Sequence, residues 1–174
     1  MSAPVNAFAH HAGTVPAERI AALREEIATF NAEYCAVLDR GDLETWPLFF
    51  TEDALYRITS RENTDLGLPV GLVYCEGRAM MHDRAVAIAR TQMFAPRYMM
   101  HILGTTRVEA ETAEAIVAQT PFLLIQTLVE GPSTLHLAAC YHDRFVRVDG
   151  RLRLAARTVI HDTEILANDL VHPA

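Results

Sequence analysis

Three histidine–aspartate pairs are the residues of this sequence best suited by type to metal binding or acid–base catalysis. They are His82–Asp83, His142–Asp143 and His161–Asp162. Imidazole and carboxylate groups are the ligands of a mononuclear non-haem iron site, and they also serve as the acid and base of a dehydratase. Adjacent side chains on a strand point to opposite faces of the sheet, so one pair cannot reach a single ion unless the strand bulges.

The last two pairs flank a predicted hairpin, so their separation can be worked out. Asp149-Gly150 is a strong two-residue turn signal, and folding there places His142 opposite Arg157 and His161 opposite Ala138. The two histidines would share a face but lie about 13 Å apart, four positions at ~3.3 Å each. Metal–nitrogen bonds are about 2 Å long, so one ion could not bind both. A change in apolar parity predicts a bulge near the HDR segment, but a one-residue shift does not close this gap. We therefore expect the pairs to be surface or interface residues paired with arginines.

His101 is a different case because it stands among apolar neighbours in the segment YMMHILG, a predicted strand. Such a histidine can be a hydrogen-bonded core or interface residue. If it faced a pocket beside a carboxylate, it could instead serve as a general base. The chain would then be a stand-alone dehydratase or isomerase acting on a small polyketide or steroid, with Tyr34, Asp53, Tyr56 and His101 lining the pocket. A third alternative is a purely structural homo-oligomer.

The elements that must position these residues follow from hydrophobic periodicity. Apolar residues at steps of three and four predict a helix over 16–41, closed by Gly41. The other N-terminal elements are a short helix from Asp42, strands over 54–60 and 72–77 joined by a polar loop, and a helix over 77–92. From residue 97 onward, apolar and polar residues alternate between turn signals, which predicts long strands over 97–111, 114–131, 133–148 and 151–165.

Helices followed by consecutive strands predict an α+β fold. We expect an NTF2-like cone, with N-terminal helices packed on a strongly curved antiparallel sheet. Residues 1–16 are expected to be a flexible arm and residues 17–174 a single domain. Enzymes with an open pocket and partner-binding subunits both use this fold, so the fold alone does not decide the function.

Composition and simple motifs argue against several classes of partner and cofactor. The net charge of −7 and a pI of about 5.6 argue against nucleic acid as a partner. The three cysteines form no CxxC motif, which indicates reduced thiols in a cytoplasmic protein. Neither a secretion signal nor an apolar run of about 18 residues is found, so we expect no membrane association. A Rieske cluster would need paired Cys and His motifs, which are absent.

The segment FNAEYCAVLDRGDLETWPLFFTEDALYRIT resembles the small (β) subunits of Rieske-type aromatic-ring-hydroxylating dioxygenases. The similarity continues through ENTDLGLPVGLVYCEGRAMMHDR, YMMHILGTTRV and DGRLRLAARTVIHDT, and covers roughly residues 20–174. Its most specific parts are Trp46-Pro47 with Phe49-Phe50, Asp83-Arg84, the HILG at 101–104 and the DG-turn hairpin. Within the family, the segments GLPVGLVYCEGRAMMHDR, RYMMHILG and TPFLLIQ look most similar to terephthalate 1,2-dioxygenase small subunits, and salicylate 5-hydroxylase small subunits follow.

This resemblance implies a non-catalytic subunit that organises an α3β3 assembly and carries no cofactor itself. The large subunit would hold the Rieske 2Fe-2S cluster and the non-haem Fe(II), and a reductase would supply electrons. No catalytic, cofactor-binding or metal-binding residue carries over to this chain. The candidate subunit-interface residues are Asp83, Arg84, Arg97, Tyr98 and His101.

Overall fold

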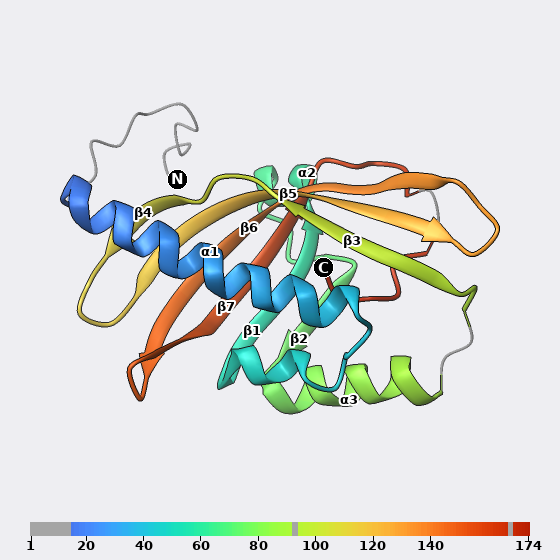
Figure 1. The fold of residues 1–174 in the computed structure, drawn as a ribbon, viewed down its shortest axis with the longest axis horizontal. Coiled ribbons are helices and arrows are strands. Elements are labelled where there is room, and N and C mark those ends of the chain that lie inside the picture. The colour runs from blue at the N-terminus through green and yellow to red at the C-terminus, as the bar shows by residue number, and fades with distance from the viewer. Residues whose placement is uncertain (1–14, 92–93, 167–168) are drawn as a thin grey trace.

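The computed structural model describes residues 15–91, 94–166 and 169–174, which form helices packed on one curved sheet (Figure 1). Of the N-terminal arm predicted over residues 1–16, residues 1–14 lie outside the described residues. The α+β fold class predicted from the sequence is confirmed.

The helices occupy the N-terminal half of the chain. The long helix α1 runs from Ala17 to Asp39, close to the predicted bounds. Its buried stripe is spaced by three and four residues, which is the periodicity that predicted the helix; the stripe is Leu23, Ile27, Asn31, Tyr34 and Leu38. The other helices are the 3-10 turn η1 (Trp46–Phe49), α2 (Arg61–Asp65) and α3 (Arg78–Arg90). We had expected a loop where α2 lies; Ser60 caps it by accepting a hydrogen bond from the Asn63 amide.

Seven strands of the described residues form a single mixed sheet in the order β2-β1-β7-β6-β5-β3, and β4 also pairs with β5. Their bounds are β1 (Phe50–Ser60), β2 (Val73–Glu76), β3 (Arg97–Leu103), β4 (Arg107–Glu111), β5 (Ile116–Leu128), β6 (Ser133–Val148) and β7 (Arg151–His161). All the pairs are antiparallel except β1 with β7, which run parallel. This pair joins the first strand of the chain to the last, so the intervening chain serves as the crossover that parallel strands require.

The β6–β7 hairpin turns where the sequence predicted. Val148 pairs with Arg151, and both Asp149 and Gly150 adopt positive φ angles, as a tight two-residue hairpin turn requires. The predicted bulge is also present, because the register shifts between Arg144 and Phe145. Similar shifts occur in the β5–β6, β4–β5 and β1–β7 pairs. Bulges increase local twist and bend strands, which accounts for the curvature of this sheet.

The core lies between α1 and the concave face of the sheet, which α1 crosses diagonally (Figure 1). Phe30 of α1 meets Phe145 of β6 edge to face, with ring centroids 5.2 Å apart. The chain returns to this space at its C-terminal residues, and Ala174 is fully buried there. The interior of the cone is therefore closed by α1 on one side and partly filled by residues that follow β7.

Candidate functional site

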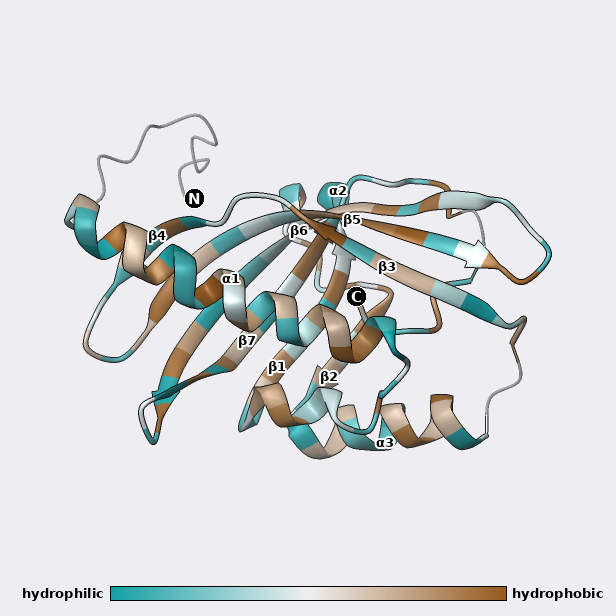
Figure 2. Cartoon of the chain, in the orientation of Figure 1, coloured by the Kyte–Doolittle hydropathy of each residue, from teal (hydrophilic) through white to brown (hydrophobic). Residues whose placement is uncertain are grey.

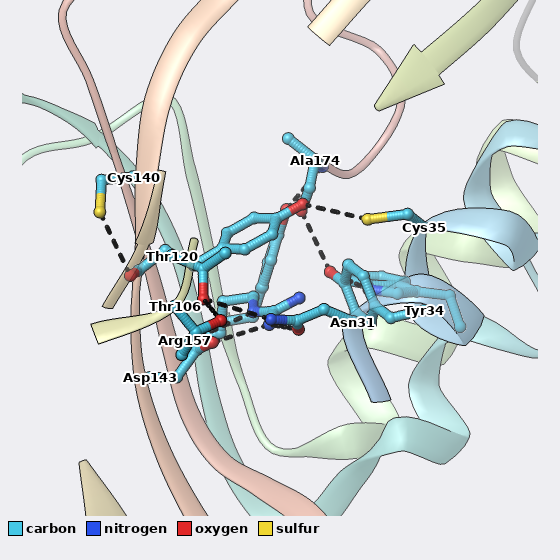
Figure 3. Close-up of polar contacts among 12 residues, drawn as sticks. Asn31, Tyr34, Cys35, Thr106, Thr120, Cys140, Asp143, Arg157 and Ala174 are labelled. Atoms are coloured by element: carbon cyan, nitrogen blue, oxygen red, sulfur yellow. Dashed lines mark hydrogen bonds and ion pairs between the residues drawn. The ribbon is translucent and has the colours of Figure 1, made fainter. Parts of the chain in front are cut away.

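The most unusual group in the interior is a buried arginine on the concave face of β7. Arg157 donates two hydrogen bonds of 2.8 Å to the carboxylate of Asp143 on β6, and neither side chain is exposed to solvent. It also donates a 2.6 Å bond to Asn31 Oδ1 on α1. Its guanidinium lies 4.1 Å from the ring centroid of Tyr34 (Figure 3) and 3.8 Å from that of Tyr141. Arg157 thus links helix α1 to both strands of the β6–β7 hairpin.

Burial and neighbouring charges shift the pKa values of the titratable groups in this cluster. Burial raises the pKa of Asp143, while the adjacent guanidinium of Arg157 opposes that shift. Burial also lowers the pKa of Arg157, but the Asp143 carboxylate outweighs this effect and holds the pKa well above its usual value. Burial raises the pKa of Tyr34 to about 12 and that of Cys35 to about 11. Tyr34 and Cys35 therefore hold their protons at neutral pH, so neither is suited to act there as a general base or a thiolate nucleophile.

Two tyrosine hydroxyls that could face a pocket are instead bonded to the chain itself. Tyr34 and Tyr56 both donate to the backbone carbonyl of Ala174, at 3.1 and 3.0 Å. The Ala174 amide donates back to the Tyr56 hydroxyl at 2.8 Å, and Trp46 Nε1 donates to the Tyr34 hydroxyl at 2.8 Å. Ala174 therefore fills the part of the cone that a substrate would need in order to reach these tyrosines.

The four residues proposed for a dehydratase-type pocket do not converge. Tyr34 and Tyr56 meet at Ala174, as described above. Asp53 is exposed and accepts a 3.0 Å hydrogen bond from Thr51. His101 lies on β3, where it contacts the ring of Phe122 and pairs with a different carboxylate.

That carboxylate is Asp39, which sequence reasoning did not single out. His101 Nδ1 lies 2.6 Å from Asp39 Oδ1, and the His101 amide donates to Asp39 Oδ2 at 3.0 Å. Because β3 is an edge strand, Asp39 bonds an amide that a neighbouring strand would otherwise have bonded. The one available signal was its place at the last residue of α1, where the helix dipole disfavours a carboxylate.

A histidine–carboxylate pair is the arrangement that activates a general base, but a general base must also be accessible to a substrate. The side chain of His101 is only 1% exposed, and Nε2 is buried without a hydrogen-bond partner among the described residues. The imidazole is therefore buried, and Asp39 satisfies a backbone amide on the free edge of β3.

His142 and Asp143 point to opposite faces of β6, as strand geometry requires, but the predicted register was wrong by one residue beyond the bulge. Asp143, not His142, lies opposite Arg157, and His161 lies opposite Ala139. His142 and His161 consequently face opposite sides of the sheet rather than the same side. In the part of the chain that the structure describes, no group of three or more His, Cys, Asp or Glu residues could hold a metal ion.

Two of the aspartates do pair with arginines, as expected. Asp143 binds Arg157, although we expected a surface or interface position and the pair is fully buried. Asp162 accepts hydrogen bonds from Arg61 on the surface. Asp83 instead lies 3.9 Å from its neighbour His82, with both side chains exposed.

The five candidate interface residues occupy different environments. Asp83 and Tyr98 are exposed on the surface. Arg84 is half-buried and donates to the Val171 carbonyl at 3.2 Å. Arg97 pairs with Asp169 at 3.0 Å, and its side chain is only 2% exposed. The fifth, His101, is buried as described above.

Comparison with known proteins identifies the family to which this arrangement belongs. A SnoaL-like domain matches residues 19–158. The beta 2 subunit of the terminal oxygenase component of terephthalate 1,2-dioxygenase from Comamonas sp is 33% identical over 140 residues, which cover 80% of this chain and 91% of that protein. The anthranilate 1,2-dioxygenase small subunit from Burkholderia cepacia is 34% identical over 148 residues, covering 85% and 92%. The chain belongs to the small-subunit family of aromatic-ring-hydroxylating dioxygenases. The resemblance drawn from the sequence is thereby confirmed.

Solved structures agree with this assignment. The beta subunit assigned to an aromatic-ring-hydroxylating dioxygenase of Novosphingobium aromaticivorans is 33% identical, with a TM-score of 0.81 over 88% of this chain and 98% of that one. The beta subunit of benzoate 1,2-dioxygenase from Burkholderia mallei has a TM-score of 0.69 over 86% and 96%, and at 12% identity it shows the fold alone. The small-subunit function is better supported than the dehydratase or isomerase alternative, and a non-catalytic role is consistent with it. No helix among the described residues is long and apolar enough to span a membrane.

Proposed function

We propose that this chain is the non-catalytic small subunit of a cytoplasmic dioxygenase that acts on an aromatic carboxylate such as terephthalate or salicylate. In this proposal it organises an α3β3 hexamer, and the large subunit carries the Rieske 2Fe-2S cluster and the non-haem Fe(II). A reductase component supplies the electrons. The names of the relatives support the substrate class, because terephthalate and anthranilate are both aromatic carboxylates.

The observation that carries the non-catalytic role is the state of the interior polar groups. A pocket enzyme needs groups that can reach substrate and exchange a proton with it. Here the hydroxyls of Tyr34 and Tyr56 are bonded to Ala174, and Arg157 is bonded to Asp143. These bonds stabilise the subunit and leave the groups concerned unavailable to a substrate.

Exposed apolar residues on the outer face of the sheet support the proposal that the chain binds a large protein partner. Tyr98, Met100 and Ile102 alternate along the edge strand β3 and are all exposed, Tyr98 by 70%. Ile102 pairs with the exposed Leu123 of β5, so the apolar surface continues onto the next strand. Figure 2 shows hydrophobic residues along β3 and β5. A contiguous exposed apolar surface on a folded domain is typical of a protein interface. We propose that the large subunit covers this surface, which includes the candidate residue Tyr98.

Co-expression tests the proposal. The chain is produced together with the Rieske-type large subunit of its own genome, with an affinity tag on the large subunit only. We expect the two to elute together in equal amounts at the mass of a hexamer, with all the iron in the large subunit. Ile102→Asp should reduce recovery of this chain by about tenfold or more, because a charge in an interface core is strongly unfavourable.

A matched control is available on the same sheet. Val148 is also apolar and exposed, but it lies at the far end of β6, next to the hairpin turn. Val148→Asp should leave recovery unchanged. Stoichiometric iron in the isolated chain would contradict the non-catalytic role. Equal recovery of the Ile102→Asp and Val148→Asp variants would show that the partner binds elsewhere.

A further inference from the structure

A cleft of about 360 Å³ lies between α1 and the segment that joins β3 to β4. Arg24, Ala28 and Asn31 line it from one face of α1, since they are spaced by four and three residues. Residues 103–106 and Thr120 of β5 line the opposite wall. None of these residues takes part in the contacts around Ala174, so the cleft is a separate feature of the fold.

The floor of the cleft carries a hydroxyl hydrogen that has no acceptor. Thr106 Oγ1 and Thr120 Oγ1 are 2.9 Å apart, and both residues are more than nine-tenths buried. Two hydroxyls that share one hydrogen bond use only one of their two hydrogens in it. Neither hydroxyl donates to any other acceptor among the described residues, so one donor on the floor is left over.

The polarity of this floor is set by the buried arginine. A guanidinium can only donate, so its 2.6 Å bond fixes the Asn31 oxygen toward Arg157 and the Asn31 nitrogen toward Thr120. That nitrogen lies 3.4 Å from Thr120 Oγ1 and donates to it (Figure 3). Hydrogen bonds in such a chain polarise one another. This chain of hydrogen bonds therefore runs from the charged Arg157 in the core through Asn31 to the threonine hydroxyls, and it presents a hydrogen-bond donor to the cleft.

The rim of the cleft also favours a ligand with a negative charge. Arg24 is exposed and forms no ion pair within the described residues, whereas Arg19 and Arg147 nearby are paired with Glu111 and Glu26. Among the residues that the structure describes, no aspartate or glutamate lines the cleft. A ligand with a negative charge and oxygen acceptors would thus meet a cation at the rim and a donor on the floor.

We propose that this cleft binds a small organic carboxylate. The carboxylate group is held by Arg24, an oxygen of the ligand accepts the spare threonine hydroxyl hydrogen, and the hydrocarbon part rests against Ala28 and Leu103. The volume suits a molecule of the size of a single aromatic acid. This site belongs to the small subunit itself and goes beyond its proposed role in assembly.

Benzoate is a suitable probe, with benzamide as its neutral isostere, and binding to the full chain is measured by isothermal titration calorimetry. We expect one benzoate per chain with a Kd of about 0.1–1 mM, and binding of benzamide weaker by about tenfold or more. Arg24→Gln should weaken benzoate by about tenfold, and Thr106→Val, which keeps the shape and removes a hydroxyl, by about fivefold.

Arg40→Gln is the matched control, because Arg40 is also exposed and without an ion pair among the described residues but lies at the opposite end of α1. This variant should bind benzoate as the parent does. The proposal is overturned if benzoate gives no saturable binding up to about 20 mM, if benzamide binds as well as benzoate, or if Arg24→Gln and Arg40→Gln weaken binding equally. Circular dichroism of each variant confirms that the comparison is made on folded protein.

Discussion

Replacing Arg157 by methionine should destabilise this subunit more than a change at any exposed site. Methionine keeps much of the length of the side chain but removes its charge, which leaves the Asp143 carboxylate buried without the two hydrogen bonds that it now accepts. Removing one partner of a buried ion pair costs about 3–5 kcal/mol. The upper part of that range is expected, because Asn31 also loses a donor and two tyrosine rings lose their cation.

Urea unfolding measures this loss, and the single tryptophan of the chain provides the signal. Trp46 is fully buried and bonded to Tyr34, so its fluorescence reports on the same core. With a slope of about 2 kcal/mol/M, the expected loss lowers the unfolding midpoint by about 2 M. The double variant Arg157→Met/Asp143→Leu removes both charges and should lose only about 1–3 kcal/mol, because Asn31 is then the main group left unsatisfied.

The pH dependence provides an independent check on the cause. Burial already raises the pKa of Asp143, and Arg157 is the group that opposes this shift. In Arg157→Met the pKa of folded Asp143 therefore rises further above its unfolded value, so the folded state binds the proton more tightly. Stability of that kind is present below the unfolded pKa and is lost as pH rises through the folded pKa. The deficit of the variant relative to the parent should thus grow from about pH 4 toward pH 8.

Two results would refute this reasoning. One is an Arg157→Met variant within about 1 kcal/mol of the parent, which would mean that water or a rearrangement compensates the carboxylate. The other is a double variant no more stable than the single one, which would show that loss of packing, rather than an uncompensated charge, determines the cost.

Three further changes test the other contacts by urea unfolding. Tyr56→Phe removes the hydroxyl that both donates to and accepts from Ala174, so it should cost about 1–2 kcal/mol and speed proteolysis of the residues after β7; unchanged proteolysis would contradict the anchoring role. Asp39→Ala leaves two donors of His101 without an acceptor and should cost about 1–3 kcal/mol, with faster hydrogen exchange in β3 than in β7; equal exchange in the two strands would rule out edge protection. Gly71→Ala would place a Cβ 2.5 Å from a backbone oxygen of β1, so we expect a loss of about 1–3 kcal/mol, and a neutral result would show that the loop can move.

The sequence predicted the features of the fold that depend on local spacing. The apolar steps of three and four gave the helix α1, and the Asp149-Gly150 pair gave the hairpin turn, because both signals lie within a few neighbouring residues. The parity change near residue 143 also predicted the bulge correctly. The effect of the bulge on strand pairing was not predictable, so the predicted register beyond it was wrong by one residue. Because of this shift, Asp143 rather than His142 lies opposite Arg157.

Contacts between distant segments were not accessible in this way. Asp39 meets His101 across 62 residues, and Asn31 meets Arg157 across 126. Nothing in the spacing of either pair indicates the contact, since each depends on how α1 lies across the sheet. The short helix α2 was missed for a related reason: its polar sequence shows no apolar periodicity, and a single Ser60 cap begins it.

By itself, then, the sequence determined the fold class and the separation of His142 from Asp143, because periodicity, turn chemistry and strand alternation act over a few residues. Its resemblance to known small subunits indicated the family. Only the tertiary structure decided which polar groups face one another inside the cone, and that Ala174 occupies the space beside Tyr34 and Tyr56. Those outcomes depend on long-range packing, in which a one-residue shift of register or a small change in helix position exchanges one partner for another.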